Sequence, residues 1–244
     1  PPEARPARAA APRAGDCDHY RLRSAGPPAA RARRVKRPQS RDTAAAPAAE
    51  GDTTYLSVVD RDGLAVSFVH SLSLAFGAGV TVPGTGILLN DRVGRGFTLE
   101  PGHPNRLAPG KRTMSTLNCY LVTQEGKPTI VGGTPGGDGQ VQWNLQVLSA
   151  MLDHGSTPEE AVSAPRWTHS PTTDPWTVDA PETLTVEERV PATTIEGLRR
   201  RGHPVTVVGP WQAGGSAQVI GIDPAAGLLK GGSDPRGGGL ALGR

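Results

Sequence analysis

Residues 53–70 read TTYLSVVDRDGLAVSFVH, and the composition of the chain changes where this stretch begins. Two runs rich in β-branched and aromatic residues, 54–60 and 64–70, flank the turn sequence Arg61-Asp62-Gly63. Two such runs separated by a short turn are typical of a β-hairpin. We therefore expect the folded part of the chain to begin at Thr53.

Further elements follow the hairpin toward the C-terminus. Strands are expected at 118–122, 128–132, 205–208 and 217–222, and helices at 140–152, from 156 onward and at 191–201. Helical spacing of apolar residues supports the first helix, and Pro158 followed by two glutamates supports the start of the second. Strand pairs, then helices, then strands predict an α+β layered fold with a mostly antiparallel sheet.

Residues 1–52 have a different composition. They hold 11 of the 26 Lys and Arg residues, 15 Ala and 8 Pro, and carry a formal charge of +5 against −2 for 53–244. Such a segment cannot bury enough apolar area to offset its ordering entropy, so we expect 1–52 to be disordered and 53–244 to be the folded domain. The basic run 31–37 lacks interleaved aromatics and a recognisable binding fold, which favours a solvated linker over a nucleic-acid site.

The composition argues against several classes. Two cysteines cannot form a disulfide framework, and no apolar run approaches the roughly 18 residues that a membrane span needs. The first residues lack the apolar stretch of a secretory signal, which favours a cytoplasmic location. The six histidines have no metal-ligand spacing, so we expect no metal and no cofactor.

Few segments carry a chemical signal, and each is weak by itself. A Thr-Thr pair such as Thr53-Thr54 usually reflects β propensity, and His70 on an apolar strand is usually a core residue. The loop at 132–139, GGTPGGDG, leads into a predicted helix, where backbone N–H groups can face an anion or an oxyanion. It lacks the phosphate-binding lysine and the dinucleotide fingerprint, so by itself a tight turn is the commoner interpretation.

Taken together, however, these segments resemble the small subunit of γ-glutamyltransferases. The motifs occur in the family's order: TTYLSVVD (53–60), GTGILLN (84–90), PGKRTMST (109–116), GTPGG (133–137), APRW (164–167) and SDPR (233–236). The resemblance implies an N-terminal nucleophile hydrolase, a four-layer αββα sandwich that is incomplete without a large-subunit half. It also implies a precursor that cuts itself between Asp52 and Thr53.

The resemblance assigns a role to each matching residue. Thr53 would be the nucleophile, and its freed amine, with a pKa of about 7.7–8.0, would be the base. The N–H groups of Gly136 and Gly137 would hold the oxyanion. Ser71 stands where the family usually has a threonine that hydrogen-bonds the nucleophile.

The substrate pocket departs from the family's pattern. Ser115 and Thr116 match a serine pair that helps to hold the substrate carboxylate, but Ser73 takes the place of a pocket asparagine. Arg95 lies near the point where the family has an acid that faces the glutamate α-amine. An arginine repels an α-ammonium and favours a carboxylate or a neutral group, which argues against glutathione as the substrate.

We therefore expect a γ-glutamyltransferase-like N-terminal-threonine hydrolase or transferase that acts on an amide or C–C bond of a non-glutathione substrate in secondary metabolism. Cephalosporin acylases and the C–C-cleaving homologues of 4-alkyl-proline antibiotic pathways are the precedents within the superfamily. The expected partners are a large-subunit-like chain or segment and a small acyl or γ-glutamyl-like substrate, with no membrane or nucleic acid. The alternatives are a true γ-glutamyltransferase (glutathione hydrolase), a catalytically inactive truncated relative, and a nucleic-acid-binding module through residues 1–52.

Overall fold

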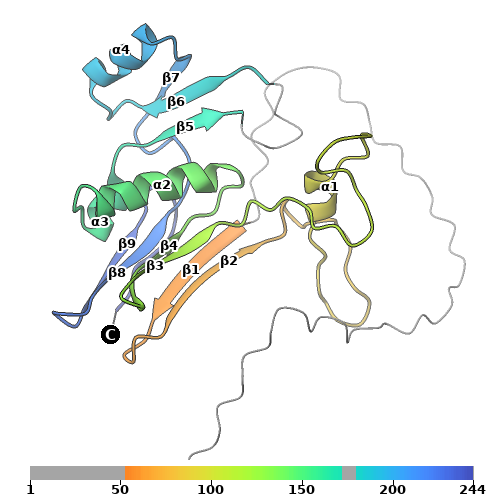
Figure 1. Ribbon diagram of the computed structural model, residues 1–244, viewed down its shortest axis with the longest axis horizontal. Coiled ribbons are helices and arrows are strands. Elements are labelled where there is room, and N and C mark those ends of the chain that lie inside the picture. The colour runs from red at the N-terminus through yellow and green to blue at the C-terminus, as the bar shows by residue number, and fades with distance from the viewer. Residues whose placement is uncertain (1–52, 172–179, 244) are drawn as a thin grey trace, which may run out of the picture. The chain divides into compact units, whose positions relative to one another are not determined.

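The computed structural model describes residues 53–171 and 180–243 (Figure 1). The predicted hairpin is confirmed: β1 (Thr53–Val59) pairs antiparallel with β2 (Ala65–Ser71), and Thr53 lies opposite Ser71. The carboxylate of Asp60 accepts two backbone N–H groups of the turn, each at 2.9 Å, which fixes the reversal of the chain. The expected disorder of residues 1–52 lies outside the described residues.

A second, four-stranded sheet packs against the hairpin. Its antiparallel order is β3-β4-β8-β9, with β3 (Cys119–Gln124), β4 (Lys127–Gly133), β8 (Gln218–Asp223) and β9 (Leu228–Ser233). Strand β1 contacts β4 and β8, and β2 contacts β3 and β4, so the two sheets stack face to face. The strands predicted at 118–122, 128–132 and 217–222 are confirmed. Strand β9 was not predicted, since its sequence LLKGGS has little β propensity.

Two helices cover the other face of this second sheet. They are α2 (Gly139–Leu152) and α3 (Pro158–Ser163), and both match the predicted helices. Thr157 caps α3 in a reciprocal capping box with Glu160, so the local sequence fixes where this short helix begins. The core between the helices and the sheet is aliphatic; its buried members are Ile130, Val147, Ala161, Val162, Ala217 and Val219.

A third sheet follows α3 in the chain. It joins β5 (Trp167–Ser170), β6 (Thr183–Glu187) and β7 (Val205–Val208), with β6 and β7 parallel, and carries α4 (Ala192–Arg200). Helix α4 and β7 match the predicted elements, whereas β5 and β6 are additional. Leu184, Val186 and Ile195 form a separate small core here.

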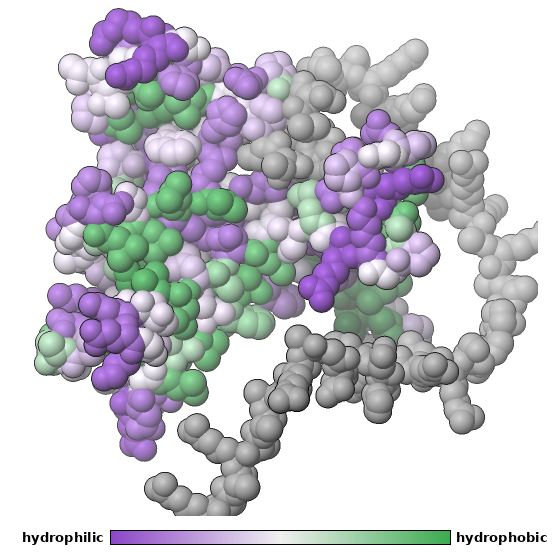
Figure 2. Space-filling view, in the orientation of Figure 1, coloured by the Kyte–Doolittle hydropathy of each residue, from purple (hydrophilic) through white to green (hydrophobic). Residues whose placement is uncertain are grey.

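Two apolar faces are exposed in the described part of the chain. The outer hairpin face consists of Leu56, Val58, Val66 and Phe68, and the α2 stripe consists of Val141, Leu145 and Leu152; each residue is 44–60% exposed. Figure 2 shows hydrophobic residues gathered over α2. The described residues thus supply a hairpin, a sheet and a helical layer, and none of their helices covers the outer hairpin face. No helix among them is long and apolar enough to cross a membrane.

Candidate active site

The hydroxyl groups of Thr53 and Ser71 meet at the open end of the hairpin. Their oxygen atoms are 2.8 Å apart, and either hydroxyl can donate the hydrogen bond. The Ser71 hydroxyl also accepts the backbone N–H of Ser73 at 3.0 Å, so its position is fixed by two partners. The structure therefore places the expected nucleophile in contact with the hydroxyl expected to orient it. Asp52, on the other side of the expected cleavage point, lies outside the described residues.

Ser73 has an unusual local environment. Its backbone is in the left-handed region with φ of 80°, its side chain is only 2% exposed, and its hydroxyl has no hydrogen-bond partner within the described residues. A buried hydroxyl without a partner costs about 1–3 kcal/mol. Such a group is typical of a site that is completed by something else, either a ligand or another part of the protein.

The glycine loop, residues 132–139, connects β4 to α2. Gly136 and Gly137 have φ angles of 126° and 56°, which favour glycine. Their carbonyl oxygens accept the first N–H groups of α2, from Gly139 at 3.2 Å and Gln140 at 3.3 Å. In the part of the chain that the structure describes, the N–H groups of Gly136 and Gly137 donate no hydrogen bond, so neither is committed to an acceptor there.

A short helix brings two arginines toward this loop. This helix, α1 (Arg92–Gly96), lies in the long connection between β2 and β3 and was not predicted. The N–H of Asp91 donates to the carbonyl of Leu72 at 2.9 Å, which holds the start of α1 beside the end of the hairpin. A β-carbon placed at Gly137 would lie 3.2 Å from Nη2 of Arg95, so the guanidinium of Arg95 lies against the glycine loop.

The second arginine, Arg92, was missed by sequence reasoning. Its Nη1 donates to Oγ1 of Thr116 at 3.0 Å, and Thr116 is 8% exposed. Burial and then the positive charge of Arg95 lower the pKa of Arg92, while the carboxylate of Asp138 raises it. No motif marks Arg92, because its partner Thr116 is distant in the sequence. Ser115 is exposed, and its Oγ accepts the N–H of Leu117 at 3.3 Å instead of joining Arg92.

A pocket of about 390 Å³ opens beside Thr53. It runs along β1 and is also lined by Pro135, Ser216 and the C-terminal residues 238–242. Gly136, Gly137, Arg95 and Thr116 are not among its lining residues. The described residues therefore place the expected nucleophile at a pocket. The groups expected to bind the oxyanion and the substrate carboxylate lie beside α1 instead.

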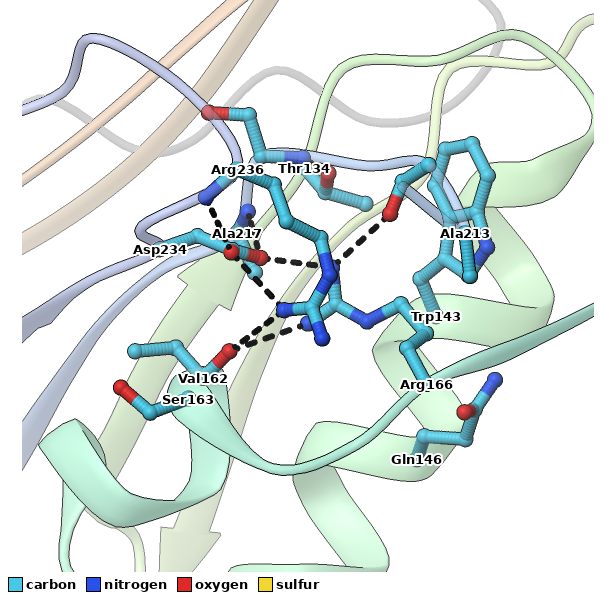
Figure 3. Close-up of polar contacts among 12 residues, drawn as sticks. Thr134, Trp143, Gln146, Val162, Ser163, Arg166, Ala213, Ala217, Asp234 and Arg236 are labelled. Atoms are coloured by element: carbon cyan, nitrogen blue, oxygen red, sulfur yellow. Dashed lines mark hydrogen bonds and ion pairs between the residues drawn. The ribbon is translucent and has the colours of Figure 1, made fainter. Parts of the chain in front are cut away.

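A buried ion-pair cluster ties the helical layer to β6 and to the end of β9. Figure 3 shows its members Arg166, Asp234 and Arg236 beside Val162. Asp234 binds Nη1 of Arg166 at 2.6 Å and Nη1 of Arg236 at 2.9 Å, and Glu187 binds Nε of Arg236 at 2.7 Å. All four side chains are at most 2% exposed. Burial lowers the pKa of Arg166 against the influence of Asp234. Burial alone would raise the pKa of Glu187, but the hydrogen bonds and charge of Arg236 hold it below its ordinary value. The motifs APRW and SDPR thus supply structural ion pairs.

The stacked sheets with helices on one face define an N-terminal nucleophile hydrolase sandwich, of which this chain holds a part. The chain belongs to the gamma-glutamyltranspeptidase family, whose sequence profile matches residues 20–243. The match therefore begins inside the Ala- and Pro-rich segment and extends almost to the last residue.

Two curated relatives illustrate the range of the family. The chain is 46% identical over 193 residues to the glutathione hydrolase-like YwrD proenzyme of Bacillus subtilis, covering 79% of this chain and 36% of the relative. It is 39% identical over 194 residues to the oxamate amidohydrolase proenzyme of Klebsiella pneumoniae, again covering 79% of this chain and 36% of the relative. The chain thus spans about a third of the length of the curated relatives that it matches.

Two solved structures match most of this chain. The gamma-glutamyltranspeptidase from Pseudomonas nitroreducens complexed with L-DON matches with a TM-score of 0.64 and 32% identity, covering 78% of this chain and 99% of that chain. LmbA2991HD matches with a TM-score of 0.71 and 35% identity, covering 83% of this chain and 36% of that chain. In the first of these structures, a separate polypeptide corresponds in extent to the region matched here.

Proposed function

We propose that the protein is an N-terminal-threonine hydrolase or transferase with Thr53 as its nucleophile. The observation that carries this proposal is the 2.8 Å contact between the hydroxyls of Thr53 and Ser71 at the end of β1. A threonine hydroxyl is a weak nucleophile and needs a base, which the α-amine of a newly formed N-terminus would supply. Cleavage between Asp52 and Thr53 is therefore part of the proposal. It is supported by the solved gamma-glutamyltranspeptidase chain that is matched over 99% of its length.

The proposed reaction has two stages. Oγ1 of Thr53 adds to the carbonyl carbon of the scissile bond while the α-amine takes the hydroxyl proton. The N–H groups of Gly136 and Gly137 stabilise the resulting oxyanion, and collapse of the adduct expels the leaving group with that proton. Water then hydrolyses the ester on Thr53 and frees both the acid and the enzyme. A transferase would use an acceptor amine in place of water.

We further propose that a large-subunit-like chain or segment completes the fold. The outer hairpin face and the α2 stripe are apolar and exposed, and faces of this kind mark interaction surfaces. The curated relatives are almost three times as long as the region matched. A partner that covers the outer hairpin face would supply the helical layer needed for an αββα sandwich. It would also close the site next to the unpartnered hydroxyl of Ser73.

For the substrate we propose an acyl group that bears a carboxylate and lacks an α-ammonium. Arg92 and Arg95 bring two guanidinium groups beside the glycine loop, and a guanidinium matches a carboxylate better than an ammonium. The similarity to an oxamate amidohydrolase supports this substrate class, because oxamate is an amide with a carboxylate and no α-amine. C–C bond cleavage in secondary metabolism, which the sequence resemblance implies as an alternative, is the second candidate.

The test is intact mass and activity of the chain expressed alone and together with a segment covering the remaining length of the relatives. We expect a fragment that begins at Thr53. We also expect Thr53-dependent hydrolysis of carboxylate-bearing acyl anilides that is at least about tenfold faster than the hydrolysis of a γ-glutamyl anilide. An intact 25.4 kDa species under both conditions would instead identify an inactive relative. Self-cleavage of the chain without anilide hydrolysis would contradict the proposed substrate class and favour substrates in which a C–C bond is cleaved.

A further inference from the structure

The indole ring of Trp143 fills the space between the glycine loop and a second loop, residues 209–217, which joins β7 to β8. Trp143 lies near the start of α2 and is 7% exposed. A β-carbon placed at Gly136 or Gly139 would lie 2.1 or 2.5 Å from a ring atom, and one placed at Gly214 or Gly215 would lie 2.6 or 2.8 Å away. These distances are shorter than any ordinary contact, so the ring packs directly on the backbone of both loops.

The orientation of the ring is fixed by a polar contact. Nε1 of Trp143 donates to Oγ1 of Thr168 in β5 at 2.7 Å, and the Thr168 hydroxyl donates in turn to the carbonyl of Ala213. A buried indole N–H requires such a partner, so the ring is held in one orientation. Trp143, Thr168 and the glycines on which the indole packs are together called the clamp.

The second loop is held independently of the indole (Figure 3). Nη1 of Arg166 donates both to the carbonyl of Gly214 at 3.1 Å and to Asp234 at 2.6 Å. The N–H of Ser216 donates at 2.9 Å to the hydroxyl of Thr134, a residue of the glycine loop. The second loop is thus hydrogen-bonded to the buried ion-pair cluster. The indole packs between this loop and Gly136, so it limits the movement of Gly136 relative to the cluster.

We propose that Trp143 is a positioning residue that fixes the N–H groups of Gly136 and Gly137 for oxyanion binding, without touching the substrate. This inference rests on the proposed function, in which these two groups hold the oxyanion. Consecutive glycines have little conformational preference of their own, so their direction must be imposed by neighbours. The indole lies against Gly136, and the guanidinium of Arg95 lies against Gly137. Donors held in place before the reaction stabilise a transition state without reorganising.

The experiment compares Trp143→Leu, Trp143→Phe and Thr168→Val in the complete protein, with Trp167→Phe as the matched control. Trp167 is 38% exposed, and its ring is not among the close neighbours of the loop glycines. We expect Trp143→Leu to lower kcat per processed chain by about tenfold or more with KM changed less than about twofold. Trp143→Phe keeps a ring, and Thr168→Val keeps the indole but removes the hydroxyl that binds its N–H and the carbonyl of Ala213, so both should lose less. Amide hydrogen exchange at Gly139 and Gln140, whose N–H groups donate to the carbonyls of Gly136 and Gly137, should quicken at least about tenfold in Trp143→Leu and stay unchanged in Trp167→Phe.

The two measurements separate this inference from the proposed function. If the wild-type protein shows no Thr53-dependent cleavage or activity, the proposed function fails, and exchange at Gly139 and Gln140 still decides whether the indole fixes the glycine loop. If the wild type is active, two results overturn the inference: unchanged exchange in Trp143→Leu, or a change in KM in place of kcat. Should Trp143→Leu fail to fold, the same criteria apply to Trp143→Phe and Thr168→Val, with smaller effects.

Discussion

Thr53 and Ser71 occupy directly opposite positions of the β1–β2 hairpin, which is why their hydroxyl oxygens come within 2.8 Å of each other. Side chains alternate between the two faces of a strand, so a slip of one residue in register would point one of the hydroxyls to the opposite face. The position of the proposed nucleophile therefore depends on the same pairing that seats Tyr55 against the second sheet. The register of the hairpin therefore determines both how the hairpin packs and how close the hydroxyls of Thr53 and Ser71 lie.

The first prediction concerns the Ser71 hydroxyl. Ser71→Ala removes the partner of Thr53, and a typical hydrogen bond contributes about 0.5–1.5 kcal/mol, so self-cleavage and kcat should fall by about two- to tenfold. Ser71→Thr keeps the hydroxyl and should retain most of the activity. The rates are measured by intact mass over time and by anilide hydrolysis. Equal activity of the alanine and threonine variants would contradict this role.

The nucleophile itself gives a second prediction. Thr53→Ala should abolish both self-cleavage and activity, because no other group near the hairpin end is proposed to attack the carbonyl. Thr53→Ser keeps the hydroxyl and should remain active at a reduced rate. Intact mass and anilide hydrolysis are again the measurements. An uncleaved Thr53→Ala protein with full activity would show that the nucleophile lies elsewhere.

A third prediction concerns substrate choice. Arg95→Asp together with Ser73→Asn should increase hydrolysis of γ-glutamyl anilides and decrease that of carboxylate-bearing acyl anilides. The reason is that an acid attracts an α-ammonium and repels a carboxylate. The ratio of the two kcat/KM values reports the change, with Arg112→Asp, an exposed residue of a nearby loop, as the charge-matched control. A ratio that moves equally in the control would assign the effect to net charge alone.

Much of the fold was predictable because local signals agreed with the tertiary structure. The hairpin follows from two β-prone runs around a turn, and α3 follows from its capping box and Pro158. The missed strands lack such signals, since β9 is glycine-rich and β5 has only four residues. The α1 helix has five residues and no side-chain cap, so nothing local marks it.

The site was predictable only in part, for a similar reason. Thr53 and the glycine loop lie in contiguous sequence motifs, and Ser71 directly follows the second β-prone run of the hairpin. The polar contacts of Arg92 and Trp143 are with residues far along the chain, which spacing does not reveal.

A fourth prediction follows from the exposed apolar faces. Leu56→Lys with Phe68→Lys changes a directly opposed pair on the outer hairpin face, where each side chain is almost half exposed. We expect the double variant to reduce copurification of a tagged large-subunit-like segment by at least about tenfold, since two charges would be buried without partners. Glu125→Lys, in the β3–β4 turn, is the control and should copurify normally. Undiminished copurification of the double variant would mean that this face is not the interface.

The last prediction concerns the buried ion pairs and their dependence on pH. The pKa of Glu187 in the folded protein lies below its ordinary value of 4.5. Its ionised form therefore contributes stability that is fully present above about pH 4.5 and is lost as pH falls through the lower folded-state pKa. Removing one partner of a buried ion pair costs about 3–5 kcal/mol, so Glu187→Gln should lower Tm by at least about 6 °C at pH 7.

The pH dependence of the Glu187→Gln variant tests whether the ionised carboxylate of Glu187 is the source of this stability. Because acid removes the charge from the wild-type carboxylate as well, the Tm difference between Glu187→Gln and the wild type should shrink as pH falls below about 4. The control is Glu196→Gln, which breaks the exposed ion pair with Arg199, whose atoms are 2.7 Å apart. An exposed pair contributes at most about 1 kcal/mol, so this variant should melt within a few degrees of the wild type at every pH. A Tm difference for Glu187→Gln that stayed constant from pH 7 to pH 3 would show that the ionised carboxylate is not the source of the stability.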